Sequence, residues 1–214
     1  MTALQKKSNV QLTEIANYYS KKLDNYGQTP GGVDWNGEES QMIRFEQLSR
    51  VITKTSGFSV NDLGCGYGAF YDYLLKHFGA VFYIGIDISP KMVQAAENRY
   101  RHVAEVNFFC ADKPNQIADY GIASGIFNVR LSCPDMQWCT YIKNTLDEID
   151  RTSRLGFSFN CLTSYSDAEK MKKYLYYADP REMFSFCKER YSRNVALLHD
   201  YGLYEFTILV RKVL

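Results

Sequence analysis

Glycine alternates with other residues in the stretch Asp62-Leu63-Gly64-Cys65-Gly66-Tyr67-Gly68. The residues that lead into it, 59–63, are typical of a short buried strand, and those that follow, 69–78, are typical of an amphipathic helix. Glycines at such a junction permit a tight turn and a close approach of the backbone to a ligand, which the free N–H groups of the helix N-terminus also face. The stretch therefore predicts a ligand-binding turn between a strand and a helix.

Strand-like runs alternate with longer helical runs from residue 59 onward, which is typical of a parallel sheet covered by helices on both faces. Ser89 and Pro90 mark one helix start, because the serine hydroxyl can cap a free N–H and proline needs no donor in the first turn. The further expected strands are 81–88, 106–110, 125–130 and 156–162, and the expected helices are 69–78, 90–102 and 137–152.

The two ends of the chain have a different pattern. After helical segments within 167–191, two strand-like runs, 195–199 and 205–212, flank Asp200-Tyr201-Gly202, which predicts a closing antiparallel hairpin. The first residues predict two helices, 12–23 and 40–53, joined by the Gly- and Pro-containing segment 29–36. We expect one domain over 1–214, with a helical cap over 1–58 and an α/β core over 59–214.

Carboxylates end three consecutive expected strands. Asp87 stands 23 positions beyond Gly64 (87 minus 64), where it can accept hydrogen bonds from both hydroxyls of a ribose. Asp112 ends the third strand, where it can accept a bond from an adenine amino group. Together with Asp62, these acids would line the edge of the sheet at which open α/β sheets bind ligands.

The glycine pattern also fits the dinucleotide-binding motif G-x-G-x-x-G/A, with Ala69 in the last position. Asp62 argues against a dinucleotide, because a carboxylate before the turn suits a cationic ligand and repels a pyrophosphate. A hydride-transfer set is not evident either, since Tyr67 and Tyr100 have no suitably spaced lysine. A nicotinamide-dependent oxidoreductase is therefore the weaker interpretation.

The chain resembles the class I S-adenosylmethionine-dependent methyltransferases through the segments 62–68, 85–89 (Gly-Ile-Asp-Ile-Ser) and 111–112 (Ala-Asp). The resemblance covers about residues 58–165. It implies a Rossmann-like α/β fold, with a mostly parallel seven-stranded sheet and a C-terminal antiparallel hairpin. It also implies S-adenosylmethionine as the cofactor and S-adenosylhomocysteine as the product.

The same resemblance assigns cofactor contacts. The glycine loop would hold the methionine portion, Asp87 the ribose, Ile88 and Met92 the adenine faces and Asp112 the adenine amino group. Aromatic residues and an arginine of the cap would lie near the methionine end, and the end of the fourth strand would lie beside the donated methyl group. The expected cofactor-binding residues are Tyr18, Tyr19, Arg44, Asp62, Gly64, Cys65, Gly66, Asp87, Ile88, Met92, Asp112, Lys113 and Asn128.

The acceptor side is less defined. Phe127-Asn128-Val129-Arg130 departs from the N/D-P-P-Y/F motif of nucleobase and glutamine amide methyltransferases, so those substrates lose support. A hydroxyl acceptor more often needs a base than a neutral amine does, and His199, followed by Asp200, is the candidate catalytic residue. The expected substrate-binding residues are Asp34, Trp35, Arg130, Tyr165 and Tyr177.

Composition narrows the function classes. The 25 basic and 24 acidic residues give a formal charge of +1 without long blocks of like charge, which disfavours nucleic acid and an anionic membrane as partners. The six cysteines have neither zinc-ligand spacing nor a dense disulfide pattern, so we expect buried thiols and no metal. No run is apolar enough for a membrane span, and we expect a cytoplasmic protein.

These observations favour methyl transfer to an O or N atom of a small polar molecule, such as a sugar or a specialised metabolite. A protein methyltransferase and a non-catalytic S-adenosylmethionine-binding module remain alternatives, and the sequence does not decide the oligomeric state. An open groove would indicate a protein substrate, whereas a capped pocket would indicate a small one.

Overall fold

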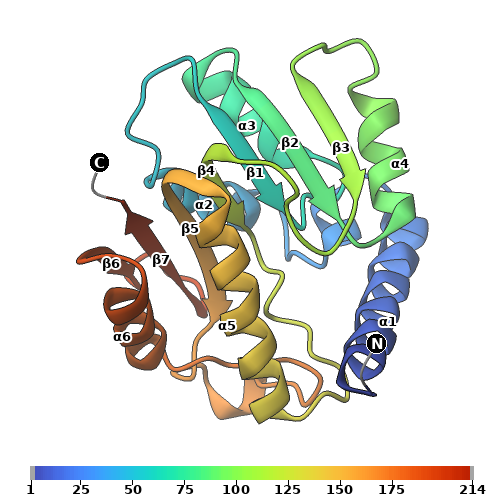
Figure 1. Cartoon of the computed structure of the whole chain (residues 1–214). Helices are drawn as coiled ribbons and strands as arrows, with labels where there is room; N and C mark the ends of the chain where they lie inside the picture. Colours follow the sequence, from blue (N-terminus) through green and yellow to red (C-terminus); the bar gives the residue numbers. More distant parts are fainter. Residues whose placement is uncertain (1–2, 213–214) are drawn as a thin grey trace.

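A mixed sheet forms the centre of the molecule (Figure 1). The structure, a computed structural model, describes residues 3–212 and the side chains of residues 12–212. Within this range the strand order is β3-β2-β1-β4-β5-β7-β6; β1 to β5 are parallel, and β7 is antiparallel to both of its neighbours. The strands are β1 (Ser59–Leu63), β2 (Phe82–Asp87), β3 (Val106–Cys110), β4 (Ala118–Ala123), β5 (Ser153–Leu162), β6 (Asn194–Leu198) and β7 (Glu205–Arg211).

Helices cover both faces of the sheet. Trp138 and Ile142 of α5 and Met183 of α6 belong to one buried cluster, whereas Phe45 of α2 and Leu74 of α3 belong to a second cluster on the opposite face. Figure 1 shows α5 in front of the strands and α2 and α3 behind them. The helical segments are α1 (Ala3–Tyr26), η1 (Pro30–Val33), α2 (Glu38–Ser49), α3 (Ala69–Phe78), α4 (Pro90–Arg99), α5 (Asp135–Arg151), η2 (Ala168–Lys170) and α6 (Pro180–Arg190).

The expected α/β fold, the C-terminal antiparallel hairpin and the helical N-terminal cap are confirmed. The strands 59–63 and 106–110 and the helix 69–78 have the predicted bounds. Ser89 caps α4 as expected, because its Oγ accepts a hydrogen bond from Met92 N at 3.3 Å and Pro90 occupies the first turn. Local signals of this kind position the end of β2 and the start of α4 from sequence alone.

The cap packs against the carboxyl ends of the strands. Helix α1 contacts η1 and α4, and the Oγ atoms of Ser20 and Ser89 are 2.9 Å apart. Lys91 of α4 forms an exposed ion pair with Asp24 of α1 at 2.7 Å. Because Ser89 lies two residues after the end of β2, these contacts hold α1 beside the edge where the three acids were expected.

The predicted strand 125–130 is wrong. The fourth strand is Ala118–Ala123, which lies between β1 and β5 and is buried at every position. Residues 125–130 form a turn instead, and Gly125 has a φ of +72° that a strand residue does not adopt. The β-branched and aromatic residues in Ile126-Phe127-Asn128-Val129 are typical of a strand. The true strand, 118–123, contains an aspartate and a glycine, which are uncommon in strands, so its pattern is weaker.

Several boundaries also differ from the predictions. The helix expected to reach residue 102 ends at Arg99, the helix expected over 40–53 spans Glu38–Ser49, and the segment 167–191 is helical only at Ala168–Lys170 and Pro180–Arg190. The expectation of buried thiols holds for Cys65, Cys133, Cys161 and Cys187, but Cys110 is exposed and Cys139 is half-buried. Among the described residues, no helix is both long and apolar enough to cross a membrane.

Candidate functional site

The turn after β1 is closed by the neighbouring strand. The backbone N–H groups of Gly64 and Cys65 donate to Ile86 O at 2.7 and 3.1 Å. Gly64 and Gly66 have φ values of +78° and +57°, and a Cβ at Gly64 would lie 2.1 Å from Ile126 Cγ2. A side chain at Gly64 would therefore clash, and the glycines let the backbone form an open cradle.

Asp87 links this turn to the start of α4. Its Oδ2 accepts from Gly66 N at 2.9 Å and its Oδ1 accepts from Ser89 N at 2.8 Å. Burial raises the pKa of Asp87 to about 6, and the backbone N–H groups around it, which favour the charged form, limit the rise. Each carboxylate oxygen keeps a further lone pair, so Asp87 can still accept hydrogen bonds from a ligand.

Two buried oxygen atoms in the same region have no hydrogen-bond partner among the described residues. Asp62 Oδ2 accepts from the Tyr83 hydroxyl, whereas Asp62 Oδ1 and Ser124 Oγ are unpaired. Burial raises the pKa of Asp62 to about 7, the hydrogen bond from Tyr83 opposes the rise, and the charge of Asp87 adds to it. Buried polar atoms without partners are rare, so these two indicate a place where a polar ligand completes the structure.

A first cavity, with about 920 Å³ of empty space that includes open solvent, joins these groups. It lies over the carboxyl ends of β1, β2 and β4 and beneath the cap, which contributes Leu12, Ile15 and Phe45. Nine of the residues expected to bind the cofactor line it: Tyr19, Asp62, Gly64, Cys65, Gly66, Asp87, Ile88, Met92 and Asp112.

The other expected cofactor residues lie elsewhere. The Tyr18 hydroxyl donates to Asp34 Oδ2 at 2.5 Å, outside the first cavity, and Lys113 is exposed and does not line it. Arg44 and Asn128 line a second cavity instead. The expectation for Asn128 rested on the strand 125–130, which does not exist.

The second cavity has about 470 Å³ of empty space and shares four lining residues with the first: Tyr19, Val33, Trp35 and Gly125. Its remaining wall is Asp34, Asn36, Arg44, Asn128, Val129, Leu162, Leu175 and Glu205. The two cavities therefore adjoin at residues of the cap and of the turn after β4.

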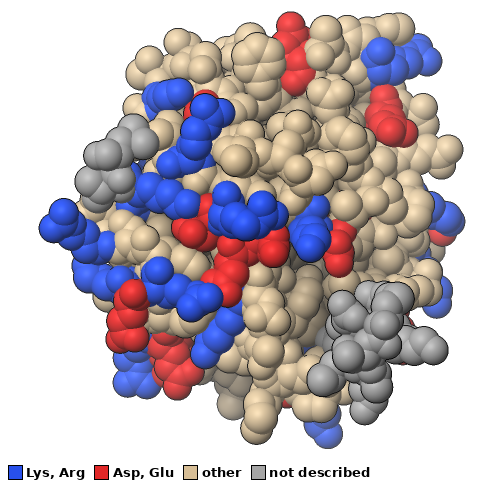
Figure 2. Space-filling model, in the orientation of Figure 1, with Lys and Arg blue, Asp and Glu red and all other residues tan. Residues whose placement is uncertain are grey.

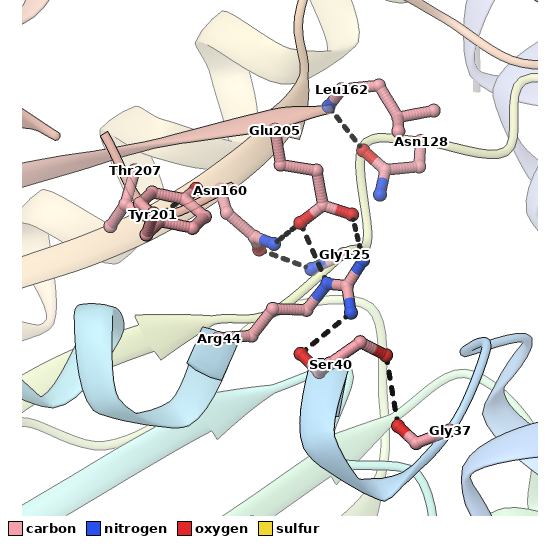
Figure 3. A network of polar contacts seen from close by, with 10 residues as sticks. All are labelled: Gly37, Ser40, Arg44, Gly125, Asn128, Asn160, Leu162, Tyr201, Glu205 and Thr207. Carbon is pink, nitrogen blue, oxygen red and sulfur yellow. Dashed lines mark hydrogen bonds and ion pairs between the residues drawn. The ribbon is translucent and has the colours of Figure 1, made fainter. Parts of the chain in front are cut away.

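A buried polar network crosses this boundary (Figure 3). Arg44 of α2 donates from Nε and Nη2 to the two carboxylate oxygens of Glu205 on β7, at 2.8 and 2.7 Å, and from Nη1 to Ser40 O at 2.8 Å. Glu205 also accepts from Asn160 Nδ2 at 2.5 Å, and Asn160 Oδ1 accepts from Gly125 N at 2.7 Å. The network thus ties the cap to β7, β5 and the turn after β4.

Trp35 is held within the boundary by two of these residues. The Arg44 guanidinium carbon lies 3.9 Å from the centroid of the Trp35 ring, within the range of a cation–π contact. A Cβ at Gly125 would lie 2.3 Å from Trp35 Cη2, so only glycine permits the ring to lie there. The indole therefore contacts both the guanidinium and the backbone at Gly125.

The structure brings only some of the expected substrate residues to the second cavity. Asp34 and Trp35 line it, whereas Arg130, Tyr165 and Tyr177 line neither cavity. Arg130 instead donates to Leu175 O and Cys133 O, at 3.1 and 2.8 Å. The Tyr177 hydroxyl accepts from Lys172 N at 2.9 Å. The side chains of Arg130 and Tyr177 therefore both form hydrogen bonds with main-chain groups of 172–175.

His199 is likewise outside both cavities. It is exposed at the end of β6, and its ring lies 6.0 Å from that of Tyr165 and 6.1 Å from that of Phe206. The neighbouring Asp200 is also exposed. The structure therefore separates this histidine from the residues that line the candidate site.

Sequence reasoning missed several lining residues. Glu205 gave no local signal, because its partner Arg44 lies 161 positions away. Ser124 and Gly125 follow the strand that was not predicted, and correct placement of β4 would have put them at the carboxyl edge of the sheet. Phe45 and Tyr141 also line the first cavity, but in the sequence such aromatic residues cannot be distinguished from core residues.

Fold and site together define a class: an open α/β sheet with a glycine turn, acids at the strand ends and a ligand cavity above them. Comparisons with known proteins agree. Residues 60–156 match the family described as a methyltransferase domain. The chain is 59% identical over 163 residues to "Putative methyltransferase Rv1506c" of Mycobacterium tuberculosis (strain ATCC 25618 / H37Rv), with 76% of this chain and 98% of that protein covered.

A more distant relative resembles part of the chain, and two solved structures share its fold. Malonyl-[acyl-carrier protein] O-methyltransferase of Paenibacillus sp. (strain JDR-2) is 26% identical over 135 residues, which cover 60% of this chain and 48% of that protein. Among solved structures, magnesium protoporphyrin IX methyltransferase (ChlM) from Synechocystis PCC 6803 with bound SAH superposes with a TM-score of 0.67 at 15% identity, covering 94% of this chain and 99% of that one. N-methyltransferase NodS from Bradyrhizobium japonicum WM9, in complex with SAH, gives 0.65 at 15% identity, with 92% and 97% covered.

The chain belongs to the class I S-adenosylmethionine-dependent methyltransferases. It is an enzyme whose cofactor is S-adenosylmethionine. The first cavity fits this cofactor, since the unpaired Asp62 Oδ1 suits its ammonium group and the backbone of Gly64 and Gly66 lines the cavity beside it.

The raised pKa values of Asp62 and Asp87 predict how stability depends on pH. Both carboxyls are ordinarily half-protonated near pH 3.8 and titrate at about 7 and 6 in the folded chain. Between about pH 4 and 7 the folded chain therefore binds protons that the unfolded chain has released. The free energy of unfolding consequently falls as pH rises through this range. We expect Asp62→Asn to be more stable than the wild type above pH 7, with the gap closing toward pH 5.

Thermal unfolding of the ligand-free protein from pH 5 to pH 8 measures this gap. Asp200→Asn, which changes an exposed aspartate outside both cavities, is the control and should follow the wild type. An Asp62→Asn curve parallel to that of the wild type would contradict the prediction.

The Arg44–Glu205 pair predicts a non-additive effect on stability. Arg44→Met leaves the Glu205 carboxylate buried without its cation, and such a loss costs about 3–5 kcal/mol of unfolding free energy. Adding Glu205→Gln removes the unpaired charge while keeping an acceptor for Asn160, so the double variant should recover most of the loss. Urea denaturation of the single and double variants gives the coupling, and a single-variant cost below about 1 kcal/mol would show that the pair does not hold the cap.

Proposed function

We propose that this enzyme transfers the methyl group of S-adenosylmethionine to an O or N atom of a small polar molecule, such as a sugar or a specialised metabolite. One observation carries the proposal: two cavities under the cap share the wall formed by Tyr19, Val33, Trp35 and Gly125. A donor in the first cavity and an acceptor in the second would meet at this wall.

In this proposal the first cavity holds the cofactor. Asp87 accepts the ribose hydroxyls, Asp62 Oδ1 accepts from the ammonium group, and the backbone of Gly64 and Gly66 lies along the methionine portion. Ile88 and Met92 face the adenine ring, and Asp112 accepts from its amino group. When bound, the cofactor supplies a methyl group activated by a sulfonium.

The second cavity contributes orientation. Methyl transfer is an in-line displacement, and fixing donor and acceptor in line can lower the barrier by on the order of 7–11 kcal/mol at best. Trp35, which packs against Arg44 and Gly125, offers an aromatic surface against which an acceptor can be aligned. The chain's role at this wall is to bind, orient and exclude water.

The shape of the second cavity supports a small acceptor over a protein side chain. The second cavity, with about 470 Å³ of empty space that includes open solvent, is bounded on one side by the cap residues Val33, Asp34 and Trp35, as expected of a concave small-molecule site. The nearly balanced charge, without long blocks of like charge, disfavours nucleic acid as the acceptor. We propose the cytoplasm as the compartment in which such an acceptor is met.

Asp87→Ala should weaken binding of S-adenosylmethionine by about 1–3 kcal/mol, the range for losing hydrogen bonds to a charged group. Isothermal titration calorimetry of the purified chain with S-adenosylmethionine, S-adenosylhomocysteine and NAD measures it, with Asp200→Ala as the control. Unchanged affinity in Asp87→Ala would remove Asp87 from the ribose role. NAD binding alone would point to a different ligand for the first cavity.

His199→Ala should leave turnover within about twofold of the wild type, because the side chain lies outside both cavities. A general base in the same position would lose about 100-fold or more. Initial rates of S-adenosylhomocysteine release, with any acceptor that the wild type methylates, decide between these outcomes. A large loss of turnover with intact cofactor affinity would restore His199 as the base.

A further inference from the structure

The charges around the second cavity cancel in pairs. Arg44 and Glu205, with side chains 7% and 1% exposed, form a bidentate ion pair. Asp34 is matched by Lys22, whose Nζ lies 2.6 Å from Asp34 Oδ1. A charged acceptor would therefore leave water without meeting a free opposite charge, which costs more than hydrogen bonds to neutral groups return.

Asn128 presents hydrogen-bond donors to this cavity. The residue is 6% exposed, and its Oδ1 accepts from Leu162 N at 3.0 Å, which fixes the orientation of the amide. In the part of the chain whose side chains are described, no hydrogen bond uses Asn128 Nδ2. Figure 3 shows this nitrogen pointing toward the Arg44–Glu205 pair. Because Asn128 lines the second cavity, its two N–H groups can bind a ligand in that cavity.

Arg44 adds donors of the same kind. Three of its five N–H groups are used, two on Glu205 and one on Ser40 O, which leaves one on each terminal nitrogen. Arg44 and Asn128 both line the second cavity, so this part of its wall contains N–H donors, and Glu205 balances the charge of the guanidinium. Such a wall suits an uncharged oxygen atom of a ligand, which can accept hydrogen bonds from these N–H groups.

We propose that the second cavity selects an uncharged methyl acceptor and binds a hydroxyl or carbonyl oxygen of it through Asn128 Nδ2 and Arg44. This inference rests on the proposed function, because it assumes that the acceptor enters the second cavity. It narrows the acceptor to neutral oxygen compounds and disfavours ammonium and carboxylate compounds. Asn128 is then a specificity-determining residue.

The test uses triplets of compounds on one skeleton that carry a hydroxyl, a protonated amine or a carboxylate. Methyl glucoside, methyl glucosaminide and methyl glucuronide form one triplet, and benzyl alcohol, benzylamine and benzoate form another. Binding to the complex of the full chain with S-adenosylhomocysteine is measured by ligand-observed NMR, and methyl transfer by product release. We expect the hydroxyl member of each bound triplet to bind about tenfold or more tightly than its charged partners.

Asn128→Asp isolates the role of the amide. The aspartate keeps an oxygen for Leu162 N but replaces the two donors with a negative charge. We expect about tenfold weaker binding of hydroxyl members and stronger binding of amine members, with affinity for S-adenosylhomocysteine unchanged. Asn107→Asp, the same change on exposed β3, is the control and should alter none of these values.

The outcomes separate the two claims. Equal or tighter binding of charged members in the wild type, or an equal loss across all three members in Asn128→Asp, would overturn the inference and leave the proposed function standing. If no small compound binds and a protein side chain is methylated instead, the proposed function fails together with the inference.

Discussion

One buried ion pair, between Arg44 and Glu205, joins α2 of the cap to β7. Removing two charges from water is costly, and the pair offsets this cost because its geometry is bidentate and Ser40 and Asn160 add further hydrogen bonds. The same guanidinium contacts the face of Trp35. One polar network therefore connects α2, the residues shared by the two cavities and the turn at Gly125.

Surface charges make a weaker contribution to the same architecture. Figure 2 shows basic and acidic side chains intermixed on the face that carries β6 and α6, and many of them are paired, as Arg190 is with Asp147 at 2.5 Å. Exposed pairs of this kind contribute little to stability. The counts of basic and acidic residues do not distinguish such exposed pairs from the buried pair, so composition alone gives no information about the site.

Most of the cofactor side could be predicted from the sequence because its residues are local to strand ends. Gly64, Asp87 and Asp112 each lie at or just after the end of a strand that the sequence pattern predicts, and the topology of a parallel sheet brings such positions to one edge. The acceptor side could not be predicted in the same way. Its wall combines the cap, the turn after β4 and β7, and pairing of Arg44 with Glu205 is a tertiary contact without a local signature.

The order of the chain gives this long-range pair a consequence for synthesis. Arg44 leaves the ribosome 161 residues before Glu205, which at about 5–20 residues per second is an interval of roughly 8–30 s. During that time the glycine turn and the first three strands can form, while the arginine has no carboxylate to meet. Helix α2 is therefore made well before the strand to which Arg44 is fastened, and a nascent chain has its cofactor-facing groups before the second cavity is complete.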